Sequence, residues 1–366
     1  MQPAPSSSMS GIASSLKKNR KIPAQQLSGS RISGGLLGLV IFSFPIVVIL
    51  AIFLGTVDLE TAETLFALFG EGSQRTDTII AFQRLPRVIV GLLVGVHFAL
   101  SGALLQAITR NPLADPTILG VSQGATLAVM LFLMFAVYAG NSDGSQLFTI
   151  PLEYLPLAGC LGGLIAGFAV YLLSWQSGLS PLRLTLMGIA LGAVLHALAM
   201  GLLAGWGSTR MESILLWMSG SLYARGWDHL IYLLPWTVAS LFFLPLLRRP
   251  VRLLQLEDDC ATSFGLSVPL WRSLALAVGA GLAASAVGVV GPVGFIGLVV
   301  PHLARYLSRG TNQHFYIPIV ALLGAGLVVG SDLIGRLLLS PNEVPVGIIA
   351  ALLGVPVFLV LLRRYG

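Results

Sequence analysis

From about residue 34 onward the chain consists of long apolar segments separated by short polar breaks. The clearest example is residues 84–125, where an Arg-Leu-Pro-Arg stretch precedes about 22 residues without a formal charge. A polar break containing Pro112 and Pro116 follows, and then a second apolar run begins. An uncharged stretch of this length can cross the core of a bilayer as a helix. A proline-rich break at membrane depth must pack against protein or water, so the pattern predicts two membrane helices joined by a packed turn.

Repetition of this pattern predicts an all-α polytopic membrane protein with about ten transmembrane helices. They are expected at residues 34–54, 86–108, 117–138, 153–174, 183–205, 230–247, 271–290, 294–307, 316–337 and 344–362. The uncharged run 273–304 is divided at Gly291-Pro292, because proline cannot continue the hydrogen bonding of a helix. Residues 1–33 are polar, carry a basic cluster at 17–21, and are predicted to form a disordered cytoplasmic tail. Residues 34–366 then form one transmembrane domain.

Composition supports a membrane protein, since 55% of the residues are hydrophobic and only 10% are charged, against about 25% charged in soluble domains. The net charge of +6 does not indicate nucleic-acid binding, because the basic residues form no stripe with interleaved aromatics. With both termini in the cytoplasm, fifteen of the 21 lysines and arginines fall on the inner side, as the positive-inside rule predicts. The six on the outer side are Arg75, Arg84, Arg87, Arg210, Arg225 and Arg336.

Residues with catalytic or metal-binding potential are few. The sequence has no Gly-Lys pair, so a Walker A loop is impossible, and it has no His-Glu-x-x-His motif or metal-ligand spacing. His97 and His196 lie in the middle of predicted helices, where packing or a local hydrogen bond is the expected role. Asp332 precedes Arg336 by four residues, which predicts a local ion pair. No catalytic residue and no metal site are predicted, and a chain of buried acids suited to a proton relay is missing.

The longest inner loop, residues 248–272, is too polar to span a membrane. Its residues 253–264 have helical spacing, and Gly265 is a natural helix stop. The sequence therefore predicts a short surface helix in this loop. In the outer loop 55–85, residues 58–69 are weakly amphipathic.

A series of motifs resembles the iron-siderophore and cobalamin permeases, the membrane subunits of type II ABC importers. The motifs are RLPR at 84–87, SGALLQ at 101–106, RNPLADP at 110–116, LGVSQGA at 119–125, WMSGSL at 217–222, GPVGFIGLVVPHLAR at 291–305, SDLIGR at 331–336 and EVPVGIIAALLGVPVFLVLLRR at 343–364. They occur in family order over about residues 35 to 364. The resemblance implies the type II permease fold, whose ten helices agree with the number predicted from hydropathy.

The resemblance also implies roles for particular residues. Arg84, Arg87 and Arg336 match the family's outer arginines, which dock glutamates of a substrate-binding protein; interfacial snorkelling is the alternative. The inner loop matches the family's coupling segment, which fits a cleft in the ATPase. The residues assigned to coupling are Glu257, Asp258, Asp259, Ala261, Gly265 and Leu266. Asp258, Asp259, Ala261 and Gly265 match the family pattern, whereas Glu257 stands where the family has glycine and Phe264 where it has leucine; an ordinary acidic, solvated loop is the alternative. The cytoplasmic gates of the family match Asn111, Pro112, Leu113, Pro181 and Leu182, where a plain packed turn is equally compatible with the sequence.

Taken as a whole, the resemblance implies a permease subunit that moves a ferric siderophore across the cytoplasmic membrane. Its implied partners are ABC ATPase subunits, a periplasmic or lipid-anchored binding protein, and a second permease chain, like or unlike. No cofactor is expected in this chain, because ATP and Mg²⁺ would be bound by the ATPase. Cobalamin and haem are alternative cargoes. An ion-gradient-driven carrier and a membrane-embedded enzyme are alternatives of other classes, which the missing proton relay and the missing catalytic cluster disfavour.

Overall fold

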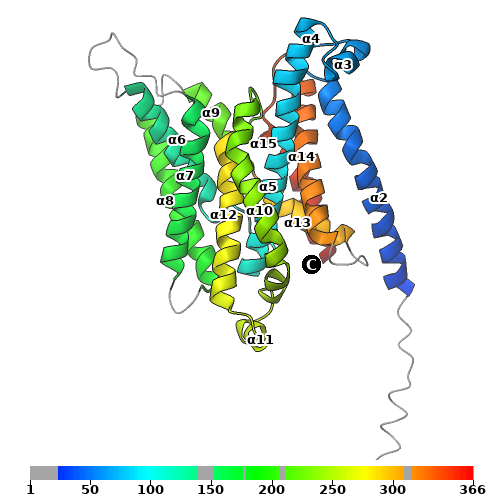
Figure 1. Ribbon diagram of the computed structural model, residues 1–366. Helices are drawn as coiled ribbons and strands as arrows, with labels where there is room; N and C mark the ends of the chain where they lie inside the picture. Colours follow the sequence, from blue (N-terminus) through cyan, green and yellow to red (C-terminus); the bar gives the residue numbers. More distant parts are fainter. Residues whose placement is uncertain (1–23, 139–151, 176–178, 207–210, 309–314, 366) are drawn as a thin grey trace, which may run out of the picture.

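The computed structural model is a bundle of roughly parallel helices (Figure 1). It describes all residues except 1–23, 139–151, 176–178, 207–210, 309–314 and 366. The longer helices are α2 (Ala24–Phe53), α5 (Leu85–Thr109), α6 (Val121–Tyr138), α7 (Leu155–Ser174), α8 (Pro181–Trp206), α10 (Trp227–Leu253), α12 (Val268–Val290), α13 (Ile296–Leu307), α14 (Tyr316–Leu338) and α15 (Val346–Tyr365). The shorter ones are α3 (Thr61–Leu68), α4 (Gln74–Ile79), α9 (Met211–Met218) and α11 (Asp258–Ser263). Over the residues described, the all-α prediction is confirmed.

Among the described residues, six helical segments are long and apolar enough to cross a membrane. They are Gln74–Thr109, Leu155–Ser174, Pro181–Gly205, Trp227–Leu253, Val268–Val290 and Tyr316–Leu338. Four shorter apolar helices complete the bundle: Leu37–Phe53, Val121–Phe135, Ile296–Leu307 and Val346–Val360. These ten segments lie where the ten helices were predicted.

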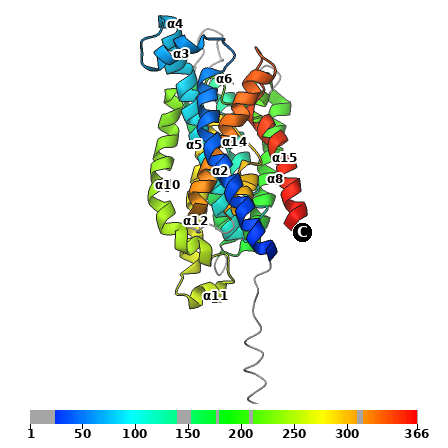
Figure 2. The ribbon, with the colours of Figure 1, turned by 90° about the vertical axis from the view of Figure 1, so that its right-hand side faces the viewer.

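The bundle has two ends that differ in what projects from them. Helices α3 and α4 lie at one end and α11 lies at the other, as both views show (Figures 1 and 2). We name these the α4 end and the α11 end. Helix α2 begins and α15 finishes toward the α11 end, which is the arrangement that an even number of spans requires.

Helices α5 and α12 form the centre of the bundle. In each, 78% of the most apolar 18-residue window is buried, whereas only 17% of that window is buried in α8. Glycines permit the close packing: a Cβ atom on Gly95 of α5 would overlap the backbone of Gly324 of α14. Such small residues at helix crossings are typical of membrane proteins. Helix α8, in contrast, turns a long row of leucine, isoleucine and valine side chains outward.

Several predicted boundaries need correction. Helix α2 begins at Ala24, so residues 24–33, which were assigned to the tail, are helical; they contain no proline to interrupt the helix. Residues 1–23 lie outside the described residues. Helix α10 continues through Pro250 to Leu253, because a membrane helix can tolerate the lost hydrogen bond of a proline. The predicted surface helix is consequently shorter than 253–264 and is reduced to α11, after which Gly265 has a φ of +79°.

Candidate functional site

Two clusters of charged side chains lie at opposite ends of α5. We name them the α4-end cluster (Arg84, Arg87, Asp332, Arg336 and Glu343) and the α11-end cluster (Arg110, Asp258 and Arg272). Helix α5 carries arginines into both, and the stretch between them is uncharged and mostly buried. Each cluster also joins α5 to elements far away in the sequence.

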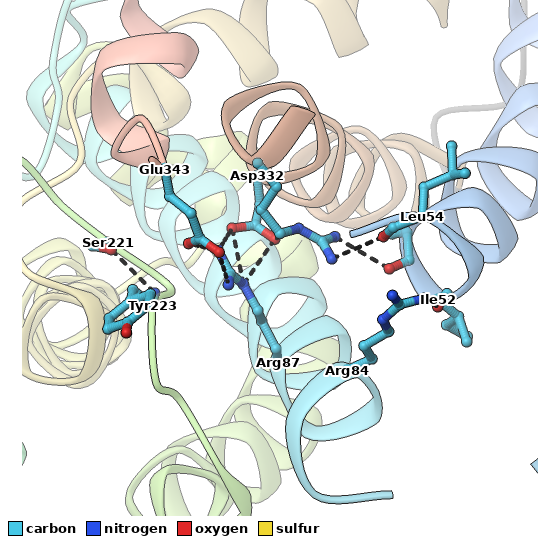
Figure 3. Close-up of polar contacts among 10 residues, drawn as sticks. Ile52, Leu54, Arg84, Arg87, Ser221, Tyr223, Asp332 and Glu343 are labelled. Atoms are coloured by element: carbon cyan, nitrogen blue, oxygen red, sulfur yellow. Dashed lines mark hydrogen bonds and ion pairs between the residues drawn. The ribbon is translucent and has the colours of Figure 1, made fainter. Parts of the chain in front are cut away.

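Arg87 is the centre of the α4-end cluster (Figure 3). Its guanidinium group donates to Asp332 from Nη2 at 2.7 Å and from Nε at 3.1 and 3.2 Å. It also donates to Glu343 from Nη1 at 3.0 Å and from Nη2 at 2.8 Å. One planar fork thus binds two carboxylates, an arrangement that lysine could not reproduce. It holds α5, α14 and the loop before α15 together.

Arg336 and Arg84 bind the end of α2. Arg336 forms an ion pair with Asp332 at 3.0 Å, which confirms the predicted local pair, and it donates to the carbonyls of Leu54 and Ala51 at 3.2 Å. Arg84 donates to the carbonyls of Ile52 and Phe53 at 2.9 and 2.6 Å, and also to that of Val57. The last carbonyls of a helix have no partner within it, so the two arginines cap α2. Their side chains are only 5% and 3% exposed for Arg84 and Arg336, respectively.

Arg84 is positioned by an irregular turn. Residues Ile80–Arg84 form a π-helical turn between α4 and α5. Pro86, at the start of α5, has no N–H to donate to the carbonyl four residues earlier, so the regular α-helical bonding is interrupted there. Turns of this kind are frequent at functional sites.

A cavity of about 400 Å³ lies beside the α4-end cluster. Four arginines line it, namely Arg84, Arg87, Arg225 and Arg336, together with the single carboxylate of Glu343. No role was predicted for Arg225 or Glu343. The signal for Arg225 was its place among the six arginines predicted on the outer side. The arrangement of the cavity suits an acidic group entering from outside the bundle.

Arg225 is held less firmly than the other arginines of the cavity. Its Nη1 lies 3.0 Å from Nε2 of His229, whereas its Nε is buried without a hydrogen-bond partner among the described residues. Burial lowers the pKa of Arg225 to about 10, so the side chain keeps its charge at neutral pH. An incoming carboxylate would meet the Nη atoms of Arg225, which form no ion pair among the described residues, whereas the buried Nε lies out of its reach.

At the α11 end, Asp258 binds two arginines. Nη2 and Nη1 of Arg272 donate to its two oxygens at 2.7 and 3.1 Å, and Nη2 of Arg110 donates to it as well. The hydrogen bond from Arg272, followed by that from Arg110, lowers the pKa of Asp258. Asp258 is the first residue of α11, Arg110 ends α5 with a φ of +51°, and Arg272 lies in α12. The short helix α11 is therefore joined to both central helices.

The other predicted coupling residues lie around Asp258 without sharing its contacts. Glu257 and Asp259 are exposed, and so is Gly265. Ala261 is fully buried and Leu266 nearly so. Only one of the three acids thus points into the bundle, while the other two remain available at its surface.

The predicted gate residues lie at the α11 end of the bundle. Oδ1 of Asn111 accepts a hydrogen bond from the N–H of Leu113 at 2.9 Å, which closes a tight turn after α5. Pro112, Leu113 and, at the start of α8, Leu182 are exposed, and Pro181 is half-buried. Beyond the turn, Gly120 lies against Gly192 of α8. The turn is thus packed only in part, since Ala114, Asp115 and Pro116 are buried whereas Pro112 and Leu113 are exposed, and its role as a gate stays a prediction.

The two mid-helix histidines have different surroundings. His97 is fully buried, with Nδ1 3.0 Å from Oγ of Ser285 and Nε2 2.8 Å from Oγ1 of Thr237. It therefore makes the local hydrogen bonds expected of it, which link α5 to α12 and α10. His196 is exposed on α8.

Comparison with known proteins assigns the chain to a family. The model of the FecCD transport family matches residues 43–364. The chain belongs to the FecCD transport family. This confirms the resemblance found in the sequence motifs.

Curated relatives and a solved structure agree with membership of the FecCD family. The iron(3+)-hydroxamate import system permease protein FhuG of Bacillus subtilis is 35% identical over 319 residues, 87% of this chain and 94% of FhuG. The ferric enterobactin transport system permease protein FepD of Escherichia coli is 37% identical over 318 residues, 86% of this chain and 91% of FepD. A solved structure described as an inward-facing metal-chelate type ABC transporter is 29% identical with a TM-score of 0.75, and covers 91% of this chain and 99% of that one. The predicted permease fold is confirmed.

Proposed function

We propose that the chain is the permease subunit of an ATP-driven importer that moves a ferric siderophore across the cytoplasmic membrane. The observation that carries this is the attachment of α11 to α5 and α12 through Asp258. Helix α11 projects from the bundle and is ion-paired to its two central helices. A movement of an ATPase bound to α11 can therefore be transmitted to the transmembrane helices α5 and α12. Membership of the FecCD family and the hydroxamate and enterobactin systems named for its relatives support this cargo class. Cobalamin and haem are the alternative cargoes.

The α4 end is the proposed docking face for a substrate-binding protein. The cavity beside Arg87 offers four arginines against one carboxylate, so its charge favours acidic side chains of a partner. Because Arg84 and Arg336 are already bonded to backbone carbonyls, we assign them mainly to shaping the cavity. Arg225, which forms no ion pair among the described residues, would then meet the incoming carboxylate, and Arg87 would contact one only by exchanging it for Glu343.

At the α11 end, an ATPase with bound ATP and Mg²⁺ would receive α11, with Glu257 and Asp259 free to contact it. A second permease chain, like or unlike, would pack against the exposed apolar side chains of α8 and α15. The turn at Asn111–Leu113 and the start of α8 would close the path toward the cytoplasm. In this arrangement both chain termini face the cytoplasm.

Reconstitution tests the coupling assignment. In proteoliposomes holding the permease and its ATPase, deletion of residues 257–266 should leave ATP hydrolysis running while uptake of ferric siderophore stops. Normal, ATP-dependent uptake by the deletion variant would contradict the assignment. Uptake by the permease alone, driven by an ion gradient, would instead establish the secondary-carrier alternative.

A further inference from the structure

A second cavity, of about 360 Å³, opens between α5, α10, α13 and α14 at the α11 end. Its volume is within the range of about 300–1,000 Å³ that is usual for small-molecule pockets. Three arginines line it, Arg248 and Arg252 from α10 and Arg305 from α13. Among the described residues, none of those that line it is a carboxylate. The cavity is distinct from the α11-end cluster, because it shares no residue with it.

The arginines of this cavity are poorly neutralised by the protein. Arg248 and Arg252 are exposed and, within the described part of the chain, make no ion pair. They are four residues apart on one helix, a spacing at which like charges repel. Nη2 of Arg305 donates to Oε1 of Gln106 at 2.6 Å, which orients the group without cancelling its charge. An anion between the three guanidinium groups would relieve this repulsion.

Most of the remaining lining is apolar and extends into the membrane-spanning part of the helices, with Gln255, Ser308 and Tyr316 as its polar members. Ala103 of α5, Val251 of α10 and Ile317 of α14 are half-buried members of this lining, and Leu244 of α10 lies deeper along it and is 7% exposed. Leu244 precedes Arg252 by two helical turns, which corresponds to about 12 Å along the axis. A polar protein loop could not satisfy its backbone against such walls, whereas a hydrocarbon chain needs no hydrogen bonds.

We propose that this cavity binds one anionic phospholipid, with its phosphate between Arg248, Arg252 and Arg305 and an acyl chain along Ala103, Val251 and Ile317. Basic pockets between membrane helices are a recognised form of lipid head-group site. The proposal needs only the membrane location of the chain. A failure of the ATPase coupling proposed above would not affect it.

The test compares three variants of the full-length chain, purified in detergent, by native mass spectrometry after incubation with phosphatidylglycerol. Arg248→Gln/Arg252→Gln should lower retention of the lipid about tenfold or more, since each arginine adds about a factor of five to anionic-lipid binding. Arg249→Gln is the matched control, because Arg249 is a neighbouring exposed arginine of α10 that does not line the cavity; it should retain the lipid. Arg248→Lys/Arg252→Lys keeps the charge and should retain most of it.

Further arms distinguish other occupants. Inorganic phosphate at millimolar concentration should not displace the lipid, and displacement by phosphate alone would mean a free-anion site and overturn the proposal. Equal retention by the double glutamine variant and the Arg249→Gln control would overturn it too. If the double variant kept the lipid but lost co-purification with the ATPase, the cavity would be a protein contact. Lipid loss in the double glutamine variant supports the proposal only if its melting temperature is close to that of the wild type. If the glutamine variant unfolds, lipid retention by the lysine variant is compared with the wild type instead.

Discussion

The two clusters at the ends of α5 both consist of arginine–carboxylate ion pairs, but they differ in the number of carboxylates and in their exposure to solvent. At the α4 end, Arg87 and Arg336 share two carboxylates, and the exposed fractions of all four side chains are 15% or less. At the α11 end, two arginines share the single carboxylate of Asp258, which is 46% exposed. The α4-end cluster is redundant and shielded from solvent, whereas the α11-end cluster depends on one accessible residue.

This difference indicates how α5 works. Besides its bond to Asp258, Arg110 donates from Nε to the carbonyl of Leu254 at 2.8 Å, so α5 is held at both ends. Its ion pairs are buried at the α4 end and accessible to solvent at the α11 end, and a helix held in this way moves more readily at the second end. The backbone carbonyls bound by Arg84 and Arg336 add to the firmness of the α4 end. We therefore expect conformational change to be concentrated near α11, and the following substitutions test that expectation.

The largest effect should come from Arg87→Ala. This substitution leaves the largely buried Glu343 without an ion-pair partner among the described residues and leaves Asp332 with Arg336 alone, and breaking a buried pair costs about 3 kcal/mol or more. Thermal unfolding of the purified permease should show a clearly lower midpoint. Arg75→Ala, which removes an exposed arginine at the same end of the bundle, should leave the midpoint unchanged. An unfolding midpoint for Arg87→Ala equal to that of Arg75→Ala would contradict the bracing role.

Asp258→Asn should affect coupling more than stability. The amide keeps the shape of the side chain but removes the charge that binds Arg110 and Arg272, so movement of α11 should no longer reach α5 and α12. In proteoliposomes with the ATPase, we expect the number of cargo molecules transported per ATP to fall severalfold. Asp259→Asn, an exposed neighbour on the same helix, is the matched control. Equal ratios for the two variants would remove Asp258 from the coupling route.

The helices of this fold were largely predictable, because each is a long apolar run and the prolines and glycines between the runs mark their ends. The polar residues from Arg248 onward led to a predicted end at residue 247, yet the helix continues to Leu253. Short helices such as α9 have too few residues to show a period. Local sequence thus predicts the positions of the transmembrane helices better than it predicts their end residues.

The site was predictable only in part. Arg87 was singled out by its motif, and the Asp332–Arg336 pair by its spacing of four residues. The partners of Arg87 lie 245 and 256 residues away, a separation at which no periodicity connects two residues. Asp258 was expected to contact an ATPase, but its bonds to Arg110 and Arg272 depend on how three helix ends meet. Such long-range pairs need the folded structure.

Charge reversal at the cavity of the α4 end should have a moderate effect on docking. Arg225→Glu removes a positive charge from the cavity without touching the pairs of Arg87, so the fold should survive. We expect the affinity for the binding protein to fall about fivefold, corresponding to about 1 kcal/mol, and the loss to be larger at low ionic strength. Surface plasmon resonance at two salt concentrations measures both quantities, with Arg75→Glu as control. Unchanged affinity at low salt would exclude Arg225 from the docking face.

The smallest effect concerns the pH dependence of the α11 end. The pKa of Asp258 is lower in the folded protein than its ordinary value, so the stabilisation from this carboxylate is present above the unfolded pKa and is lost as the pH falls through the folded pKa. Because the side chain is half-exposed, solvent screening limits the contribution to less than about 1 kcal/mol. The unfolding midpoint of the wild type should therefore exceed that of Asp258→Asn slightly at neutral pH, and the two should converge in acid below the ordinary carboxylate range. A gap that stays constant down to that acidity would mean that the charge of Asp258 does not stabilise α11, and the α11 end would then be held by packing instead.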